Sequence, residues 1–461
     1  KQLSWIMCDV TYLMLLRLIG IFVSVCIFGG CQSLSRYEVE LNQVSDAVLS
    51  GQLDDALGLH ERQHVTANQL LYFLEAGELY WLKGDYDQAL KLWRAADQLV
   101  QAWESLARLD TGLITQDVGS VLINDKVKSY QGYDFEKVML TTRIALTHLM
   151  MGDIASARVA IKATHEREAI IEGFRERQAL FVSEEDAQKS YRIEDLNGYP
   201  IETSDAPDLS GLRNSYQNAF SHYLAGFIYE QLNEPSLSAP GYRKAIELRS
   251  NHPVLRAGLM GLEERIKRPD DGYTDLLVVY EEGLSPAKIS LEINGLVVRN
   301  GGITYVPFSV PVYGARSELP QPSVTVAGDV IEFSPDIVDI DLMSRRSLKD
   351  EMPGIITRGV LRSGLKVSMQ SAADELDESG VMGDLVALAA IVTESADDRS
   401  WRLLPARIGL GRVLMRRGAH HIVFRSGSSS RSMDVVVDGK YMLLFMRRVG
   451  AQWYVKQVSF D

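Results

Sequence analysis

The feature that most constrains this fold is a pair of amphipathic segments joined by a short break, at residues 68–100 (NQLLYFLEAGELYWLKGDYDQALKLWRAADQLV). Apolar or small side chains recur on both sides of the break with spacings of three and four, which is typical of one helix face. They are Phe73, Ala76, Gly77 and Tyr80 before Lys83-Gly84-Asp85, and Tyr86, Ala89, Trp93 and Ala96 after it. We therefore predict two antiparallel helices of about fourteen residues, packed closely through Gly77 and Ala89.

The signature positions of this hairpin resemble those of a tetratricopeptide repeat. Weaker copies with the same spacing are centred on Ala145 and Gly226, and a half copy lies near Gly51. The resemblance implies stacked hairpins whose concave surface binds a peptide or a partner helix. The candidate partner contacts are the aromatic residues Tyr80, Trp93, Tyr229 and Tyr242. Insertions at 118–137 and 190–211 interrupt the stack, and each is either a functional loop or a plain bridge between hairpins.

Beyond Arg268 the composition changes at a turn-rich linker, residues 269–275. Runs with β-branched and alternating apolar residues follow, and they favour an antiparallel sheet: DLLVVYEE, KISLEI, ITYVPFSVPVYG and SVTVAGDVIEF. A helix is expected at 344–378, kinked or restarted at Pro353, and a short buried helix at 383–395. The last strands, separated at Arg416-Arg417-Gly418 and Asp438-Gly439, suggest a small sandwich.

The predicted fold class is thus α+β with several domains. A helical, tetratricopeptide-like domain is expected at 31–268, a mixed strand and helix domain at 269–396, and a C-terminal β-rich, sandwich-like segment at 397–461. Residues 1–30 are assigned to a signal peptide, with 1–13 an over-long start and Met14 the initiator.

The signal assignment depends on Cys31, which follows a short apolar run and two glycines (VSVCIFGGCQSL). The run from Leu18 to Phe28 is too short to span a bilayer as a stable helix. The stretch Ile27-Phe28-Gly29-Gly30-Cys31 resembles the lipobox of bacterial lipoproteins, which implies that Cys31 is acylated and becomes the first residue. The alternative is a short membrane helix kept as an anchor. Gln32 after the cysteine implies sorting to the outer membrane, facing the periplasm.

Several motifs together resemble a largely uncharacterised family of bacterial outer-membrane lipoproteins with tetratricopeptide-like repeats. They are the lipobox, the hairpin around Gly77, LINDK at 122–126, and DDRSW at 397–401 with Leu404-Pro405. The resemblance implies a location and an architecture rather than a reaction.

Composition and motifs limit the function further. A net charge of −13 disfavours nucleic acid and anionic headgroups, which select basic surfaces. The sequence has no HExxH, CxxC or GxSxG motif and no phosphate-binding glycine loop. His420 and His421 are neighbours on an expected strand and point to opposite faces, so they are poorly placed to share a metal. Asp398, Arg399 and Trp401 are the local cluster best suited to a role. The favoured interpretation is that Trp401 lies in the core and Asp398 caps a turn against Arg399.

Two hypotheses follow. The first is a noncatalytic envelope lipoprotein that acts as a scaffold or assembly factor, held in the membrane by acyl chains on Cys31 and bound to an envelope protein; no catalytic residue, cofactor, metal or small-molecule substrate is inferred. The second is a cell-wall or glycan hydrolase whose helical domain positions the substrate.

Overall fold

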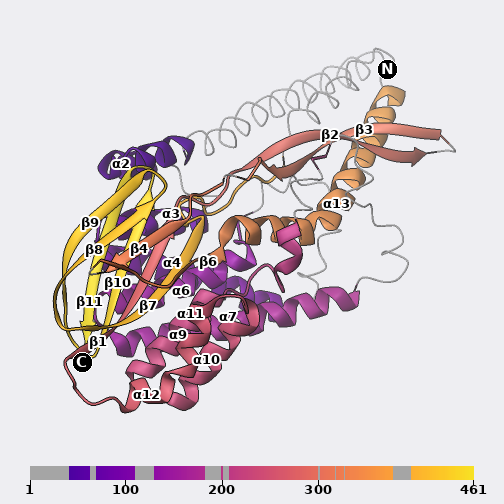
Figure 1. Ribbon diagram of the computed structural model, residues 1–461. Helices are drawn as coiled ribbons and strands as arrows, with labels where there is room; N and C mark the ends of the chain where they lie inside the picture. The colour runs from indigo at the N-terminus through magenta and orange to yellow at the C-terminus, as the bar shows by residue number, and fades with distance from the viewer. Residues whose placement is uncertain are drawn as a thin grey trace, which may run out of the picture.

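The computed structural model describes residues 41–62, 69–109, 129–181, 199–200, 207–299, 302–316, 318–326, 328–376 and 396–461. Helices dominate its first part and strands its second, in agreement with the α+β prediction (Figure 1). Cys31, LINDK and the helix expected at 383–395 lie outside the described residues, as do most of the two insertions.

Helical hairpins occupy the positions that the repeat pattern predicts. The first joins residues 41–49 to α2 (Leu53–Glu61), and the second joins α3 (Gln69–Leu82) to α4 (Tyr86–Leu109). The third joins α6 (Asp134–Met150) to α7 (Ile154–Phe181), and the fourth joins α9 (Ala219–Gln231) to α10 (Pro235–Leu248). The shorter helices α11 (Pro253–Met260) and α12 (Leu262–Lys267) follow, and η4 (Pro207–Gly211) precedes α9.

Each hairpin turns through three residues, and the middle residue has a left-handed backbone. These residues are Gly51, Gly84, Gly152 and Asn233, with φ between 56° and 81°. Glycine and asparagine tolerate this conformation better than other residues. In two of the turns the next residue caps the second helix, since Asp85 accepts from the backbone N–H of Gln88 and Asp153 from that of Ser156. The predicted break at residues 83–85 is therefore confirmed.

Close approach of the paired helices depends on small residues, as predicted. A Cβ atom placed on Gly77 would lie 2.1 Å from Nε1 of Trp93, and one on Gly226 would lie 2.7 Å from the Tyr242 ring. Trp93 also donates its indole N–H to the carbonyl oxygen of Leu74, at 3.2 Å. The large side chain of the second helix thus lies directly over the backbone of the first.

The strands form two main sheets and one separate hairpin. The five-stranded sheet has the order β11-β10-β1-β7-β6, and the four-stranded sheet has the order β5-β4-β8-β9. The first comprises β1 (Tyr273–Glu282), β6 (Phe333–Asp339), β7 (Arg407–Arg416), β10 (Tyr441–Val449) and β11 (Gln452–Phe460). The second comprises β4 (Pro322–Val326), β5 (Asp329–Val330), β8 (Gly418–Ser426) and β9 (Ser429–Val437).

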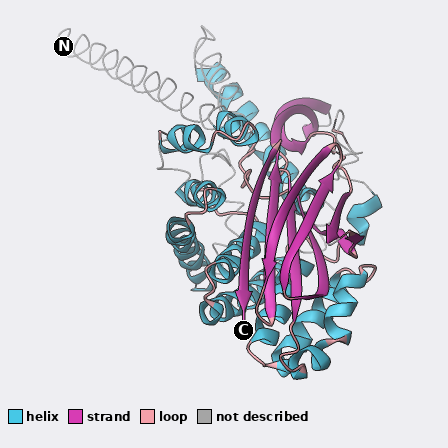
Figure 2. Ribbon diagram, turned by 60° about the vertical axis from the view of Figure 1, so that its left-hand side comes forward, coloured by secondary structure: helices cyan, strands magenta, loops and turns pink. Residues whose placement is uncertain are grey.

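Strand β1 lies in the middle of the larger sheet, parallel to β10 and antiparallel to β7. Strands from the predicted segments 269–396 and 397–461 therefore share one sheet. In Figure 2 the strands stand together, with helices to their left and at the lower right.

The five-stranded sheet is the middle of three layers, because successive side chains of a strand point to opposite faces. On β1, Leu277 and Val279 join the core formed with the helices. Leu276, Val278 and Tyr280 face the four-stranded sheet and pack near Phe424 and Val435. The sandwich expected for the C-terminal strands is thus present, but β1 and β4 also contribute to it.

An arm extends from this body, formed by the hairpin of β2 (Lys288–Arg299) and β3 (Gly302–Tyr313) and by helix α13 (Ile340–Leu376) (Figure 1). Val310 and Val312 of β3 pack against Leu348, Met352 and Ile356 of α13. The helix runs through Pro353, so of the two predicted alternatives the restart is wrong, and a kink at this residue stays a prediction.

Candidate functional site

The four aromatic residues predicted to contact a partner lie mostly in the core. Trp93 and Tyr242 are fully buried and Tyr229 is 6% exposed, whereas Tyr80 is half-buried. The Tyr242 hydroxyl donates to Glu230 at 2.6 Å and accepts from Arg412 at 2.9 Å. Trp93 and Tyr242 therefore hold their hairpins together and have no surface to offer, which corrects their assignment as partner contacts. Of the four, Tyr80 has the most accessible side chain.

The chain's own sheet covers one face of the stacked hairpins. The rings of Trp81 on α3 and Phe445 on β10 meet edge to face with their centres 4.6 Å apart, and Phe227 on α9 meets Tyr441 in the same way at 6.1 Å. These contacts bury the side of α3 and α9 that turns toward the sheet. An external partner has no access to this side while the sheet is in place.

A buried ion-pair cluster joins the same two layers. Arg143 on α6 donates to Glu78 on α3 at 2.7 Å and to Glu281 on β1 at 2.5 Å. Arg447 on β10 donates to the other oxygen of Glu78 at 2.5 Å. All four side chains are at most 1% exposed. Burial lowers the pKa of Arg143, but Glu281 and Glu78 outweigh it and leave that pKa above its ordinary value.

A second cluster ties α9 to the sheet. Arg412 on β7 reaches Glu230 on α9 at 2.9 Å and Asp275 on β1 at 2.7 Å. Arg265 on α12 reaches the same Glu230 oxygen at 2.7 Å. Burial raises the pKa of Glu230, yet Arg412 and Arg265 more than offset this and lower it overall. Both clusters pair their charges internally, so we assign them to the docking of helices on the sheet.

The DDRSW motif lies in an irregular segment, residues 396–406, that contacts α3, α4 and α6. Trp401 is fully buried, with its ring centre 6.4 Å from that of Trp93, as the favoured interpretation predicted. Its backbone N–H donates to Glu136 at 2.6 Å, and the N–H groups of Arg402 and Leu403 donate to Glu75. Two buried helix carboxylates thus replace the sheet hydrogen bonds that this segment lacks.

The charged residues of the motif are also held locally. Arg399 pairs with Asp397 at 2.7 Å. Lys288 donates to the Asp397 carbonyl oxygen at 3.1 Å. The two histidines of β8 have different partners: His420 contacts the carbonyl of Arg416 and His421 contacts Asp434.

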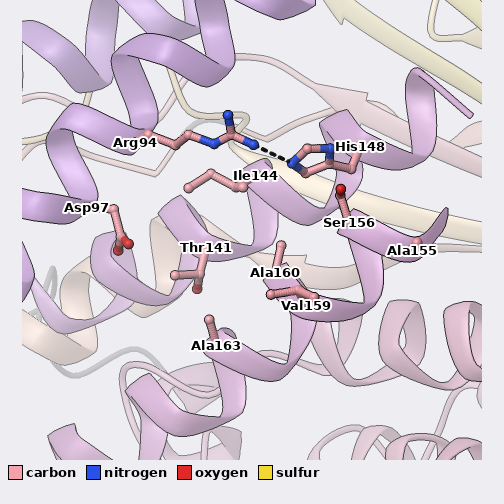
Figure 3. A pocket seen from close by; sticks show the side chains of 10 residues that line it. All are labelled: Arg94, Asp97, Thr141, Ile144, His148, Ala155, Ser156, Val159, Ala160 and Ala163. Atoms are coloured by element: carbon pink, nitrogen blue, oxygen red, sulfur yellow. Dashed lines mark hydrogen bonds between the residues drawn. The ribbon is translucent and has the colours of Figure 1, made fainter. Parts of the chain in front are cut away.

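An open groove lies on the helical layer, between α4 and α7 with α6 as its floor (Figure 3). Its cavity measures about 460 Å³. Its lining combines small, apolar and polar side chains: Arg94, Asp97, Thr141, Ile144, His148, Ala155, Ser156, Val159, Ala160 and Ala163. Val159 is 68% exposed, so its side chain is accessible on the wall that α7 forms.

Polar groups mark the ends of the groove. Arg94 donates from its guanidinium to Nε2 of His148 at 3.1 Å, and Nδ1 of His148 lies 3.5 Å from Asp153. Burial and the charge of Arg94 lower the pKa of His148, so the ring is neutral at neutral pH. Asp97 is held by Arg167 at 2.8 Å. Among the described residues, Arg94 has no carboxylate partner.

The α7 sequence carries a periodic pattern on the side of the helix that faces this groove. Ala155, Val159 and Ala163 recur every four residues on α7, and Ala160 lies beside them. The residues of α7 that pack in the core, such as Ala157 and Ile161, are also spaced four positions apart. Both stripes therefore look like core faces in the sequence, and only the structure shows that one of them is open.

Comparison with models of protein families and with curated proteins finds no match to this chain. No helix within the described ranges is long and apolar enough to cross a bilayer. Within those same ranges, no group of three or more histidine, cysteine, aspartate or glutamate side chains is placed to hold a metal ion.

Proposed function

We propose that this protein is a noncatalytic, lipid-anchored protein of the bacterial outer membrane that recruits a protein partner through its helical hairpins. The anchor is Cys31, as the lipobox resemblance implies. Two acyl chains give stable attachment, since each buried methylene contributes about 0.8 kcal/mol. The observation that carries the recruiting role is the open groove between α4 and α7.

The groove is the best candidate for the partner site because the opposite side of the hairpins is covered. The rings of Trp81 and Phe227 and the charges of Glu78 and Arg143 are buried against the sheet. A partner must therefore approach from the outer side, where Val159 supplies accessible apolar surface and Ile144 lines the floor of the groove.

The shape and chemistry of the groove fit an amphipathic helix. Small residues on α7 (Ala155, Ala160 and Ala163) let another helix approach closely, and a groove between two helices that offers apolar and polar contacts fits helix-in-groove recognition. At the edge, Arg94 supplies a cation that has no carboxylate partner within the described part of the chain. We infer that the partner helix places apolar side chains over Val159 and Ile144 and a carboxylate near Arg94.

The test compares retention of envelope proteins by purified variants. Val159→Glu places a negative charge inside the groove, and Arg94→Glu reverses the charge at its edge. Val436→Glu, at a 62% exposed position on β9, and Arg108→Glu, on the exposed side of α4, make the same changes elsewhere. We expect a partner that wild type and both control variants retain and that both groove variants lose by about tenfold or more. Equal retention by all five proteins would contradict the proposal, as would peptidoglycan cleavage by the purified protein.

A further inference from the structure

A second cavity lies where the helical and strand-rich parts meet. It measures about 370 Å³ and is formed by the α3–α4 turn together with β9, β10 and β11. Its lining comprises Trp81, Leu82, Lys83, Gly84, Tyr86, Arg431, Phe445, Trp453, Tyr454, Val455 and Lys456. Neither part of the chain forms this cavity alone.

The charge of the cavity is opposite to that of the chain. Its lining includes three cations and no carboxylate, although the whole sequence has a net charge of −13. Lys83 is paired with Asp54 at 2.5 Å. Arg431 and Lys456 have no carboxylate partner among the described residues. Their positive charge is therefore available to a ligand.

One of the residues that line this cavity has a buried donor without an acceptor. The indole N–H of Trp81 has no hydrogen-bond partner within the part of the chain that the structure describes, and the Trp81 side chain is only 3% exposed. An indole N–H can only donate, and buried indole donors normally find an acceptor. An unpaired buried donor costs about 1–3 kcal/mol, so an acceptor oxygen in the cavity would be stabilising.

Aromatic rings supply the rest of the wall. Tyr86, Trp453 and Tyr454 are all half-buried, so each presents part of a ring. The Lys456 ammonium lies 5.7 Å from the centre of the Tyr86 ring. Aromatic walls with a few convergent polar groups are typical of small-molecule sites, and the volume lies within their usual range.

We propose that this cavity binds a small anion in which a phosphate or carboxylate is attached to a ring. The anionic group accepts from Trp81 and is attracted by Arg431 and Lys456, and the ring packs on Tyr86 and Trp453. This goes beyond the proposed function, since the partner groove lies elsewhere on the helical layer and shares no lining residue with this cavity.

Calorimetric titration of the purified protein with four probes tests the proposal. Phenyl phosphate and glucose 6-phosphate each carry a ring and an anion, inorganic phosphate carries the anion alone, and glucose carries the ring alone. We expect at least one ring-bearing phosphate to bind with a Kd about tenfold or more below that of inorganic phosphate and glucose. The preferred probe distinguishes an aromatic ring from a sugar ring, and higher salt should weaken its binding.

Variants locate the binding. Arg431→Ala and Lys456→Ala change exposed residues, and each should raise the Kd about fivefold or more. Trp81→Phe keeps an aromatic ring and removes the donor, so it should weaken binding of the same probe. Lys267→Ala, on the exposed face of α12, is the control and should change nothing. The proposal fails if neither ring-bearing phosphate saturates the protein, or if the Arg431→Ala/Lys456→Ala double variant binds as tightly as wild type.

Discussion

The guanidinium of Arg143 on α6 lies 2.5 Å from the carboxylate of Glu281 on β1, and both side chains are buried completely or nearly so. The two residues are 138 positions apart in the sequence. Glu78 and Arg447 complete the cluster, so that two helices and two strands share it. We infer that this cluster determines how the helical layer sits on the sheet.

Arg143→Met should therefore destabilise the fold strongly. The variant leaves Glu281 and Glu78 buried with only Arg447 to balance them, and removal of one partner from a buried pair costs about 3–5 kcal/mol. Denaturant unfolding of wild type and variant measures this change in the free energy of unfolding. Lys267→Met breaks an exposed pair with Glu263 and should leave the unfolding midpoint unchanged. Equal midpoints for the two variants would show that the buried cluster contributes little.

Gly77→Ala should destabilise the second hairpin, because its Cβ atom would clash with the buried Trp93 ring. Overpacking of this kind costs about 1–3 kcal/mol. Gly173→Ala is the matched change on α7, where no atom lies within 4 Å of the added carbon. That variant should gain about 0.5–1 kcal/mol, since alanine favours the helix. Thermal unfolding checks this contrast: the melting temperature should fall in Gly77→Ala and rise in Gly173→Ala.

His60 should make stability depend on pH in the acid range. Burial lowers its pKa from 6.5 to about 4, and its Nε2 lies 3.0 Å from the carbonyl oxygen of Tyr72. Between pH 6.5 and pH 4 the unfolded chain binds a proton that the folded chain does not, so the free energy of unfolding falls as the pH falls. The loss over this window is about 3 kcal/mol.

His60→Gln should remove this part of the pH dependence. Denaturant unfolding at several pH values gives the free energy of unfolding of wild type and variant. The slopes of this free energy against pH are compared between pH 6.5 and pH 4. Above pH 7 the imidazole is neutral in both states, so the slopes should coincide there and serve as an internal control. Parallel slopes throughout the acid range would rule out a buried, neutral His60.

The hairpins and most strands could be predicted from the sequence because their signals are local. Gly84 marks a turn, Gly77 marks a close approach, and a run of apolar residues rich in valine marks β1. The arrangement of the layers could not be predicted, because it depends on pairs such as Arg143 with Glu281. In the sequence both are ordinary charged residues of the kind that usually lie on a surface.

The candidate sites show the same limit. Trp93 and Tyr242 were expected to contact a partner because aromatic residues are common at interfaces, yet each covers a glycine of its own hairpin. Val159 and the three alanines of the groove do not indicate an open site in the sequence, because small residues at helical spacing usually indicate core. The second cavity combines Trp81 with Lys456, and no local pattern connects residues that lie so far apart in the sequence.

The lipid anchor is tested most directly by the intact mass of the protein extracted from bacterial outer membranes. We expect a chain that begins at Cys31 and carries the added mass of its acyl groups, whereas Cys31→Ala should yield an uncleaved and unacylated precursor. A wild-type chain that retains residues 1–30, has an unmodified Cys31 thiol and fractionates with cytosolic proteins would contradict the account.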